Sequence, residues 1–256
     1  MASEGEREIQ QLKNRFAELA DKSSRQGIYT FTAFLGLSGQ ETFRQMEGEL
    51  KYAGVKLFGG FENAERRVIR FGNPEEFGYE VDFPIRCIHV CPVLPKFADK
   101  LSHRDYLGAL MRLGIERDTI GDIKTADKEA YFFCLDKVAE FICGSLDRVK
   151  HTNVKCTITD SIADIPDEEP ERINIQVASM RLDAIIARVY NKSRGECLEL
   201  FRSGRVFVDG RLCENNSRII RAGETVNARG YGRFVLAGEP GQTRKGKLCA
   251  EILVYR

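Results

Sequence analysis

The fold of the last third of the chain is decided by residues 180–213, which read MRLDAIIARVYNKSRGECLELFRSGRVFVDGRLC. The apolar residues of its first half recur at helical spacing and predict an amphipathic helix: Leu182, Ile185, Ile186 and Val189. Arg181, Arg188 and Lys192 fall on a different side of that helix. One side is therefore expected to pack while another stays basic.

A second helix and a hairpin follow directly. Ser193 and Glu196 have the spacing of a capping box, so they mark the start of a helix that runs to about Arg202 and stops at Gly204. The run VFV-DG-RLC at residues 206–213 predicts a strand, a two-residue turn and a strand. Further strands are expected at residues 225–229, 233–236 and 248–255.

The charge of the chain is divided unevenly. The total is +1, but from residue 179 onward there are 15 Lys and Arg against 8 Asp and Glu, which leaves 24 against 30 before that point. A basic module attached to an acidic body indicates that the two parts meet different partners. Phosphate groups are the natural partner of the basic part.

An acidic stretch precedes this module. Residues 160–172 combine six acidic residues with Pro166 and Pro170, a composition that buries little. We therefore expect a linker or a long acidic loop here. The predicted division of the chain is residues 1–78, 79–160, an acidic linker at 161–178, and 179–256.

Residues 79–160 alternate strand and helix signals. Strands are expected at 85–93, 120–125, 130–135 and 153–159, and helices at 104–113 and 136–146. This order, βαββαβ, is that of a ferredoxin-like domain. Such a sheet can bind RNA, but it also serves many unrelated functions.

The N-terminal residues predict an α/β segment, which makes the whole chain α+β. Ile9, Leu12, Phe16 and Leu19 recur at helical spacing, and a second helix is expected at residues 40–51 before a strand at 55–58. The glycine pair that opens residues 59–67 could approach a phosphate backbone, but an ordinary turn is the favoured interpretation.

The C-terminal pattern resembles the alpha-L RNA-binding motif, the S4 domain named for a ribosomal protein. The matching segments occur in the expected order: residues 180–183 (MRLD), 193–194 (SR), 203–206 (SGRV), 208–210 (VDG), 223–224 (GE) and 229–233 (RGYGR). Asp209 departs from the Asn that the family often has. The resemblance implies an RNA-binding domain of the S4 type.

Candidate RNA contacts follow from the motif and from chemistry. Guanidinium groups can engage phosphates with two hydrogen bonds, and glycines let the backbone approach a sugar-phosphate chain. Tyr231 is either a ring that stacks on a base or a half-buried core ring, and both interpretations stay open. Arg194, Arg205 and Arg233 are expected at three corners of one face. The candidate RNA-binding residues are Arg181, Asp183, Arg188, Lys192, Ser193, Arg194, Arg202, Gly204, Arg205, Val206, Asp209, Gly210, Arg229, Tyr231 and Arg233.

The body resembles the YlmH family of bacterial RNA-binding proteins. The similar segments are Phe34-Leu35, residues 59–67, residues 103–110 (HRDYLGAL) and Gly121-Asp122-Ile123. The resemblance implies association with rRNA of the large ribosomal subunit and with tRNA, direct contact with tRNA being left open. The resemblance also implies association with stalled subunits that carry an unfinished peptide, and therefore a role in translation quality control. It implies no catalytic residues.

Two other functions compete with RNA binding. Arg181-Leu182-Asp183 echoes the catalytic triplet of pseudouridine synthases, but it lacks the Thr or Ser and the Gly that follow it there. We interpret Asp183 as a carboxylate at a helix N-terminus. The body has no glycine-rich nucleotide loop and no phosphate-binding loop. We expect no enzyme and no cofactor; a protein-interaction adaptor is the third alternative.

The cysteines indicate a reducing compartment. Eight cysteines form no Cys-x-x-Cys pair, and the one cluster, Cys87, His89 and Cys91, occupies alternate positions of one predicted strand. Zinc would usually need a fourth ligand, so we expect no metal and small apolar thiols instead.

Residues 1–10 are charged, and no stretch is apolar enough to span a bilayer. A cytoplasmic protein that binds neither membrane nor DNA is expected.

Overall fold

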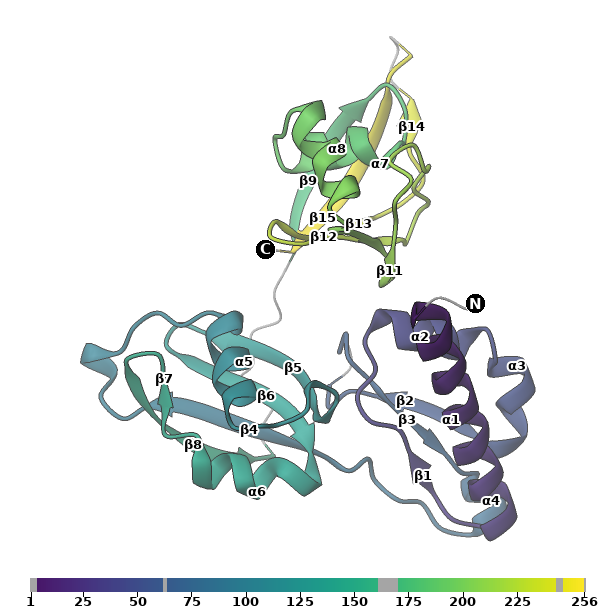
Figure 1. Cartoon of the computed structure of the whole chain (residues 1–256), viewed down its shortest axis with the longest axis vertical. Helices are drawn as coiled ribbons and strands as arrows, with labels where there is room; N and C mark the ends of the chain where they lie inside the picture. The colour runs from purple at the N-terminus through teal and green to yellow at the C-terminus, as the bar shows by residue number, and fades with distance from the viewer. Residues whose placement is uncertain (1–3, 62–63, 161–169, 243–245, 256) are drawn as a thin grey trace. The chain divides into compact units, whose positions relative to one another are not determined.

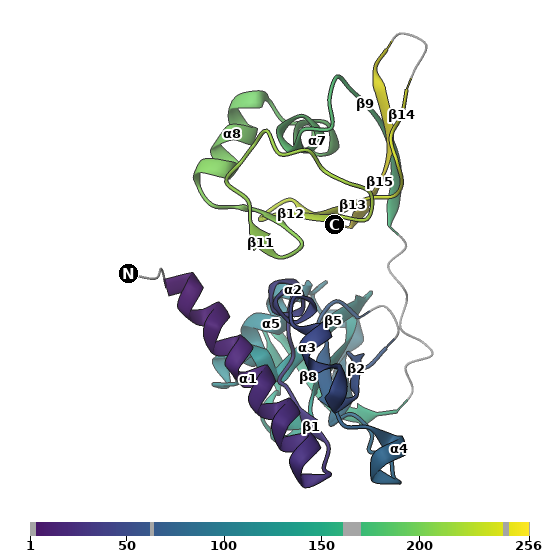
Figure 2. The same cartoon turned by 90° about the vertical axis from the view of Figure 1, so that its right-hand side faces the viewer.

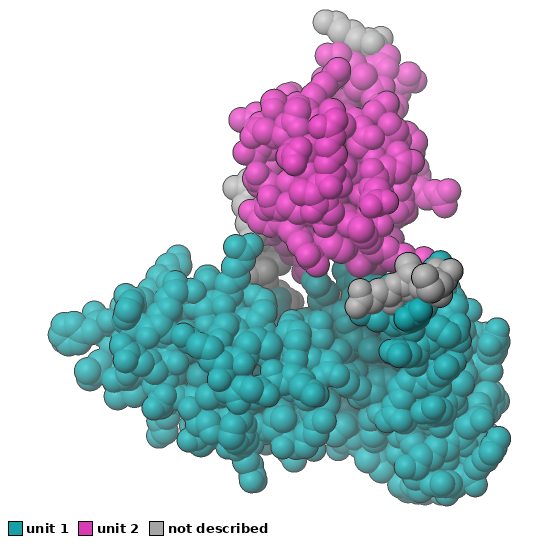
Figure 3. Space-filling view, in the orientation of Figure 1, with its two compact units in different colours: residues 1–166 teal, residues 167–256 magenta. Residues whose placement is uncertain are grey.

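The chain divides into two compact units, residues 1–166 and residues 167–256, which are coloured separately in Figure 3. This computed structural model describes residues 4–61, 64–160, 170–242 and 246–255. Across those ranges no helix has both the length and the hydropathy needed to cross a membrane. Each unit has hydrophobic cores of its own.

The N-terminal part of the first unit packs helices on a small sheet with the order β1-β3-β2. Helix α1 buries Phe16 and Ala20 against Ile69 and Phe71 of β3, as its helical spacing predicts. Figure 1 labels the elements of this part, which are α1 (Glu4–Gln26), β1 (Thr30–Phe31), α2 (Leu37–Arg44), α3 (Glu47–Leu50), a 3-10 turn (Lys51–Ala53), β2 (Val55–Phe58), β3 (Val68–Phe71) and α4 (Pro74–Phe77).

The second predicted helix, residues 40–51, is wrong as a single element. Helix α2 begins earlier, at Leu37, and a break separates it from α3. At the break the N–H of Met46 donates to the carbonyl of Phe43, three residues back instead of four, at 2.8 Å. This tighter 3-10 bonding ends the α-helix, so the chain turns before α3 begins.

The central part of the first unit is an antiparallel sheet with the order β5-β6-β4-β8, extended by β7 beside β8. Its first and third strands, β4 and β6, are the inner ones, which confirms the ferredoxin-like prediction. Ile88, Val90 and Phe132 are buried with α5 and α6 on one face. The elements are β4 (Ile85–Pro92), a 3-10 turn (Pro95–Phe97), α5 (His103–Arg112), a 3-10 turn (Arg117–Thr119), β5 (Ile120–Ala126), β6 (Glu129–Leu135), α6 (Asp136–Ser145), β7 (Arg148–Val149) and β8 (Thr152–Thr159).

A further apolar cluster joins the two sheets of the first unit. Phe34 and Val68 from the N-terminal part pack with Cys87, Phe133 and Leu135 from the central sheet. The N–H of Phe34 also donates to the carbonyl of Asp118 at 2.8 Å. The other face of the central sheet is therefore covered at one end by the N-terminal part.

The C-terminal unit places two helices on one side of an antiparallel sheet. The strand order is β11-β10-β12-β13-β15-β14, and β9 pairs with β15 as well. Figure 2 shows α7 and α8 on one side of β12 and β13. The elements are β9 (Glu171–Val177), α7 (Leu182–Val189), α8 (Arg194–Arg202), β10 (Val206–Val208), β11 (Arg211–Leu212), β12 (Thr225–Ala228), β13 (Gly232–Leu236), β14 (Gly241–Gln242) and β15 (Leu248–Tyr255).

The predicted linker, residues 161–178, is wrong over its second half. Strand β9 occupies Glu171–Val177 and pairs with β15 along its whole length. Ile175 and Val177 are buried in the core of this unit, whereas Arg172, Asn174 and Gln176, which alternate with them along the strand, are exposed. This alternation buries one face of the strand, which the acidic composition nearby concealed. Residues 161–169, the first half of the predicted linker, lie outside the described residues.

Candidate nucleic-acid interface

The start of α7 is held by a closed group of polar side chains. The Nε and Nη2 of Arg181 donate to the two carboxylate oxygens of Asp183 at 3.1 and 2.7 Å, and the Nδ2 of Asn216 donates to the same carboxylate at 3.1 Å. The hydrogen bond from Arg181 is the main reason that the pKa of Asp183 lies below its ordinary value. Asp183 is in the first turn of α7, as expected, and it neutralises the arginine beside it.

The capping box predicted for α8 is present. The Ser193 hydroxyl accepts from the N–H of Glu196 at 3.3 Å, and the Glu196 carboxylate accepts from the N–H of Ser193 at 2.9 Å. The N–H and the hydroxyl of Ser193 and the ammonium of Lys192 all donate to the Glu196 carboxylate, and these bonds lower its pKa to about 2. Arg194 and Arg202, at the two ends of α8, are both exposed. Rigid helix ends therefore present two cations to solvent.

Three segments of the C-terminal unit meet at Tyr231. The Lys192 ammonium lies 5.1 Å and the Arg205 guanidinium 5.9 Å from the centroid of its ring. The Nη2 of Arg205 donates to the carbonyl of Arg229 at 2.6 Å. Gly230 leaves the space that this guanidinium fills, because a Cβ there would collide with it. Lys192 precedes α8, Arg205 precedes β10, and Tyr231 lies in the turn between β12 and β13.

Tyr231 combines the two interpretations that the sequence leaves open. Its ring is half-buried, packs on the core of the unit and lies 5.6 Å from the ring of Tyr190. It also has Lys192 and Arg205 within cation–π distance. We define Lys192, Arg205 and Tyr231 as the basic cluster.

The hairpin after α8 is built as predicted. Asp209 and Gly210 have φ of 49° and 78°, the backbone of a tight two-residue turn. The Asp209 carboxylate accepts from the N–H of Thr225 at 3.0 Å, so this side chain holds the turn to β12. Gly204, with φ of 63°, ends α8. The side chain of Val206 is buried in the core, so it contributes packing to this region.

Arg233 does not share a face with Arg194. Its neighbours in β13, Phe234 and Leu236, are buried in the core beneath the helices, so Arg233 lies on the opposite face of the sheet. There its guanidinium lies 4.4 Å from the centroid of the Tyr255 ring, and burial lowers its pKa. The expectation of one face for Arg194, Arg205 and Arg233 is wrong, because period-two alternation along β13 turns Arg233 away.

Two aromatic residues that the sequence analysis overlooked line that opposite face. Phe207 and Tyr255 lie there, and the Arg229 guanidinium lies 4.3 Å from the ring centroid of Phe207. The Val-Phe-Val alternation of β10 could have identified Phe207, since its two neighbours are buried. The remaining predicted cation, Arg188, is exposed on α7.

The glycine stretch at residues 59–67 folds inward, which agrees with the turn interpretation. A Cβ on Gly59 would collide with the carbonyl of Arg66, and one on Gly60 with the ring of Phe133. The Arg66 guanidinium donates to the carbonyls of Ile120 and Phe34, both at 2.9 Å. Residues 62–63 lie outside the described part of this stretch.

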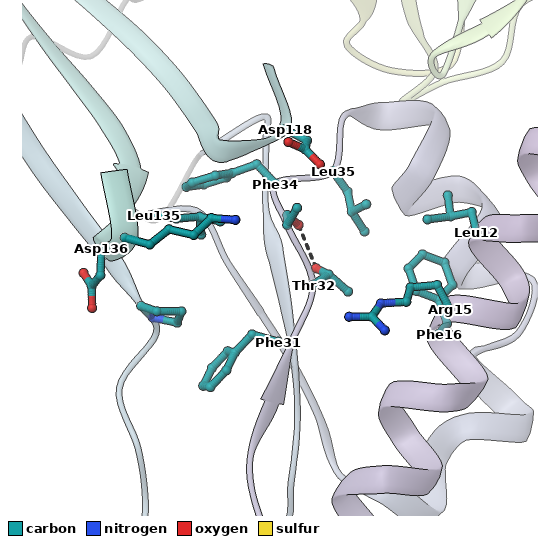
Figure 4. Close-up of a pocket in the computed structure, with 13 residues that line it drawn as sticks. Leu12, Arg15, Phe16, Phe31, Thr32, Phe34, Leu35, Asp118, Leu135 and Asp136 are labelled. Carbon is teal, nitrogen blue, oxygen red and sulfur yellow. Dashed lines mark hydrogen bonds between the residues drawn. The ribbon is translucent and has the colours of Figure 1, made fainter. Parts of the chain in front are cut away.

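The first unit also contains a cavity of about 550 Å³ between α1, β1 and the end of β6. Figure 4 shows that apolar side chains dominate its wall, with Arg15, Asp118 and Asp136 as the charged groups labelled there. The Thr32 hydroxyl points along the wall and donates to the carbonyl of Ala33 at 2.8 Å. None of the described lining residues is a histidine, cysteine or serine.

The fold and the basic cluster define an RNA-binding protein with an S4-type C-terminal domain. The family model described as "S4 domain" matches residues 180–226, and the one described as "Putative RNA-binding domain in YlmH" matches residues 79–162. A curated relative from Bacillus subtilis (strain 168), "Ribosome-associated protein quality control protein P2", is 32% identical over 202 residues, which cover 76% of this chain and 75% of the relative. The chain belongs to the YlmH family. A solved structure, "Cell division protein ylmH from Streptococcus pneumoniae", is similar with a TM-score of 0.48 and 17% identity, covering 65% of this chain and 98% of that one.

Proposed function

We propose that this protein binds structured RNA through its C-terminal unit and acts on the ribosome, where its partners are rRNA of the large subunit and tRNA. The observation that carries the proposal is the meeting of Lys192 and Arg205 at the ring of Tyr231, on a module with excess positive charge. The family and the ribosome-associated relative support it. The role is in translation quality control, in the cytoplasm.

The same proposal assigns no catalysis to the chain. Arg181 and Asp183, which echo a catalytic triplet, are bonded to each other and to Asn216. A carboxylate engaged in this way supports the start of α7 and is a poor nucleophile. Binding to RNA and to the ribosome therefore accounts for the site without a chemical step.

The test of the proposal reverses three exposed charges in the C-terminal unit. Arg194→Glu, Arg202→Glu and Arg229→Glu are combined, and we expect co-sedimentation with large ribosomal subunits to weaken by at least about 100-fold, since each change removes a phosphate contact and adds repulsion. The stability should change by less than about 0.5 kcal/mol per exposed site.

The matched control reverses three exposed arginines in the N-terminal helices, Arg7→Glu, Arg25→Glu and Arg44→Glu. It changes the net charge by the same amount, so it should retain binding. Circular dichroism establishes that both variants are folded. A folded C-terminal variant that still travels with the subunit would show that this surface does not hold the ribosome.

A further inference from the structure

The central sheet has a face that its own helices leave uncovered. Ile88 and Val90 of β4 lie under α5 and α6. Cys87, His89 and Cys91 alternate with them along the strand, so their side chains face the other way. At the Cys87 end this face is covered by the N-terminal part of the unit. The His89 end extends beyond that cover, and His89 remains partly exposed there.

His89 and Tyr131 form a stacked pair of rings on this face. They are direct partners across the two inner strands, β4 and β6, with ring centroids 4.5 Å apart and planes 12° from parallel. The Nε2 of His89 is 2.8 Å from a carboxylate oxygen of Glu129, which fixes the orientation of the imidazole. A flat stack held on rigid strands offers ready-made surfaces for a further planar ring.

The flanks of the stack are polar, and two lysines and a hydroxyl lie on the same face as the Glu129 carboxylate that contacts His89. The strand register sets Lys124 opposite Tyr131 and the exposed Thr157 opposite His89. Lys155, also exposed, pairs with Cys91 on the next row. A surface that joins stacked rings with lysines and a hydroxyl complements bases and phosphates better than it complements an apolar protein surface.

We propose that this face of the central sheet binds a short unpaired RNA segment, with a base stacked on the His89–Tyr131 pair and phosphates near Lys124 and Lys155. The ligand is single-stranded because bases inside a duplex are already stacked on one another and cannot add to the pair. The proposal deepens the proposed RNA-binding function and rests on it, but its site is separate from the basic cluster.

The experiment measures binding of the full-length protein to a fluorescent RNA of about eight nucleotides without self-complementarity, by anisotropy. Parallel measurements use the triple arginine variant as parent, in which we expect RNA binding by the C-terminal unit to be weakened. In both backgrounds Tyr131→Ala should weaken binding by about 5- to 150-fold, the range of one lost base stack. Tyr131→Phe keeps the ring and should bind like its parent.

Two further variants make the result decisive. Thr157→Glu adds a negative charge at an exposed position of the same face and should weaken binding without disturbing the core. Tyr52→Ala removes an exposed tyrosine from the N-terminal part and should leave binding unchanged. Normal binding by the Thr157→Glu variant overturns the proposal, whether or not a folded Tyr131→Ala variant also binds normally. These results can be interpreted even if the ribosome test fails, because the arginine variants and the Tyr131 variants are measured with different RNAs.

Discussion

At the scale of single residues, the partner of each arginine decides what it can do. Arg181 is neutralised by Asp183, and Arg205 is fixed by the carbonyl of Arg229, whereas Arg194 is exposed at a helix start. The side chains have the same chemistry, but an ion pair or a hydrogen bond to a carbonyl leaves fewer N–H groups free to bind a phosphate. An exposed, preoriented guanidinium is the better phosphate contact.

Asp122 is a second case in which the partners define the role. One of its carboxylate oxygens accepts from the N–H of Glu65 at 2.6 Å and the other from the N–H of Arg66 at 3.1 Å. Burial raises the pKa of Asp122. Burial also lowers the pKa of Arg66, and it lowers the pKa of Arg117 to about 10. The Gly121-Asp122-Ile123 segment therefore joins β5 to the residues before β3.

Removing this carboxylate should weaken the first unit. Asp122→Ala leaves two backbone N–H groups without their partner in a half-buried site, and we expect the free energy of unfolding to fall by about 2–4 kcal/mol in urea denaturation. Asp147→Ala, at an exposed carboxylate of the same unit, should change it by less than about 0.5 kcal/mol. Equal stabilities of the two variants would mean that the contact between β5 and the residues before β3 does not depend on Asp122.

At the scale of elements, β9 defines where the C-terminal unit begins. Its seven residues pair with β15, and Ile175 and Val177 are 4% and 7% exposed. Burying two such side chains stabilises a fold by about 3–6 kcal/mol, which is comparable to the whole stability of a small domain. We therefore propose that the domain starts near residue 170, about ten residues before the S4 motif, which begins at residue 180.

Two fragments test this boundary. Residues 170–256 should unfold cooperatively on heating, whereas residues 179–256, which lack β9, should be largely unfolded or melt at a much lower temperature. Circular dichroism melting curves and amide NMR spectra distinguish the two outcomes. Matching melting temperatures would show that β9 is an accessory strand and that the sequence motif alone defines the domain.

At the scale of the whole molecule, the distribution of charge matters more than its sum. The chain carries only +1 in total, yet the residues from 179 onward hold 15 Lys and Arg against 8 Asp and Glu. Local phosphate contacts release counterions whatever the net charge of the rest of the protein. The acidic body therefore need not prevent binding by the basic module.

Salt dependence measures this directly. If about five phosphates are neutralised, the logarithm of affinity for a structured RNA should fall with the logarithm of salt concentration at a slope of about −3.5 to −4.5. Full-length protein and the fragment 170–256 should give the same slope, since the contacts lie in the C-terminal unit. A slope near zero for the fragment would contradict the phosphate contacts, and a shallower slope for full-length protein alone would mean that the body opposes them.

Local features of the C-terminal unit follow from the sequence by itself. The capping box of Ser193 and Glu196, the stop at Gly204 and the turn at Asp209-Gly210 each depend on residues within a few positions of one another, so local chemistry specifies them. The order of the central strands and helices is similarly fixed by periodicity, because burial imposes the pattern on each element. The S4 and YlmH resemblances rest on the same short motifs.

The features that depend on pairing between distant residues appear only in the folded chain. Strand β9 needs β15, about 75 residues later in the sequence, to satisfy its backbone, and its own composition indicated a linker. Arg233 is directed away from Arg194 by the pleat of a strand whose buried face is set by the helices. The stack of His89 on Tyr131 exists because two strands align in one register. Long-range register determines which side chains share a surface, and no local pattern contains that information.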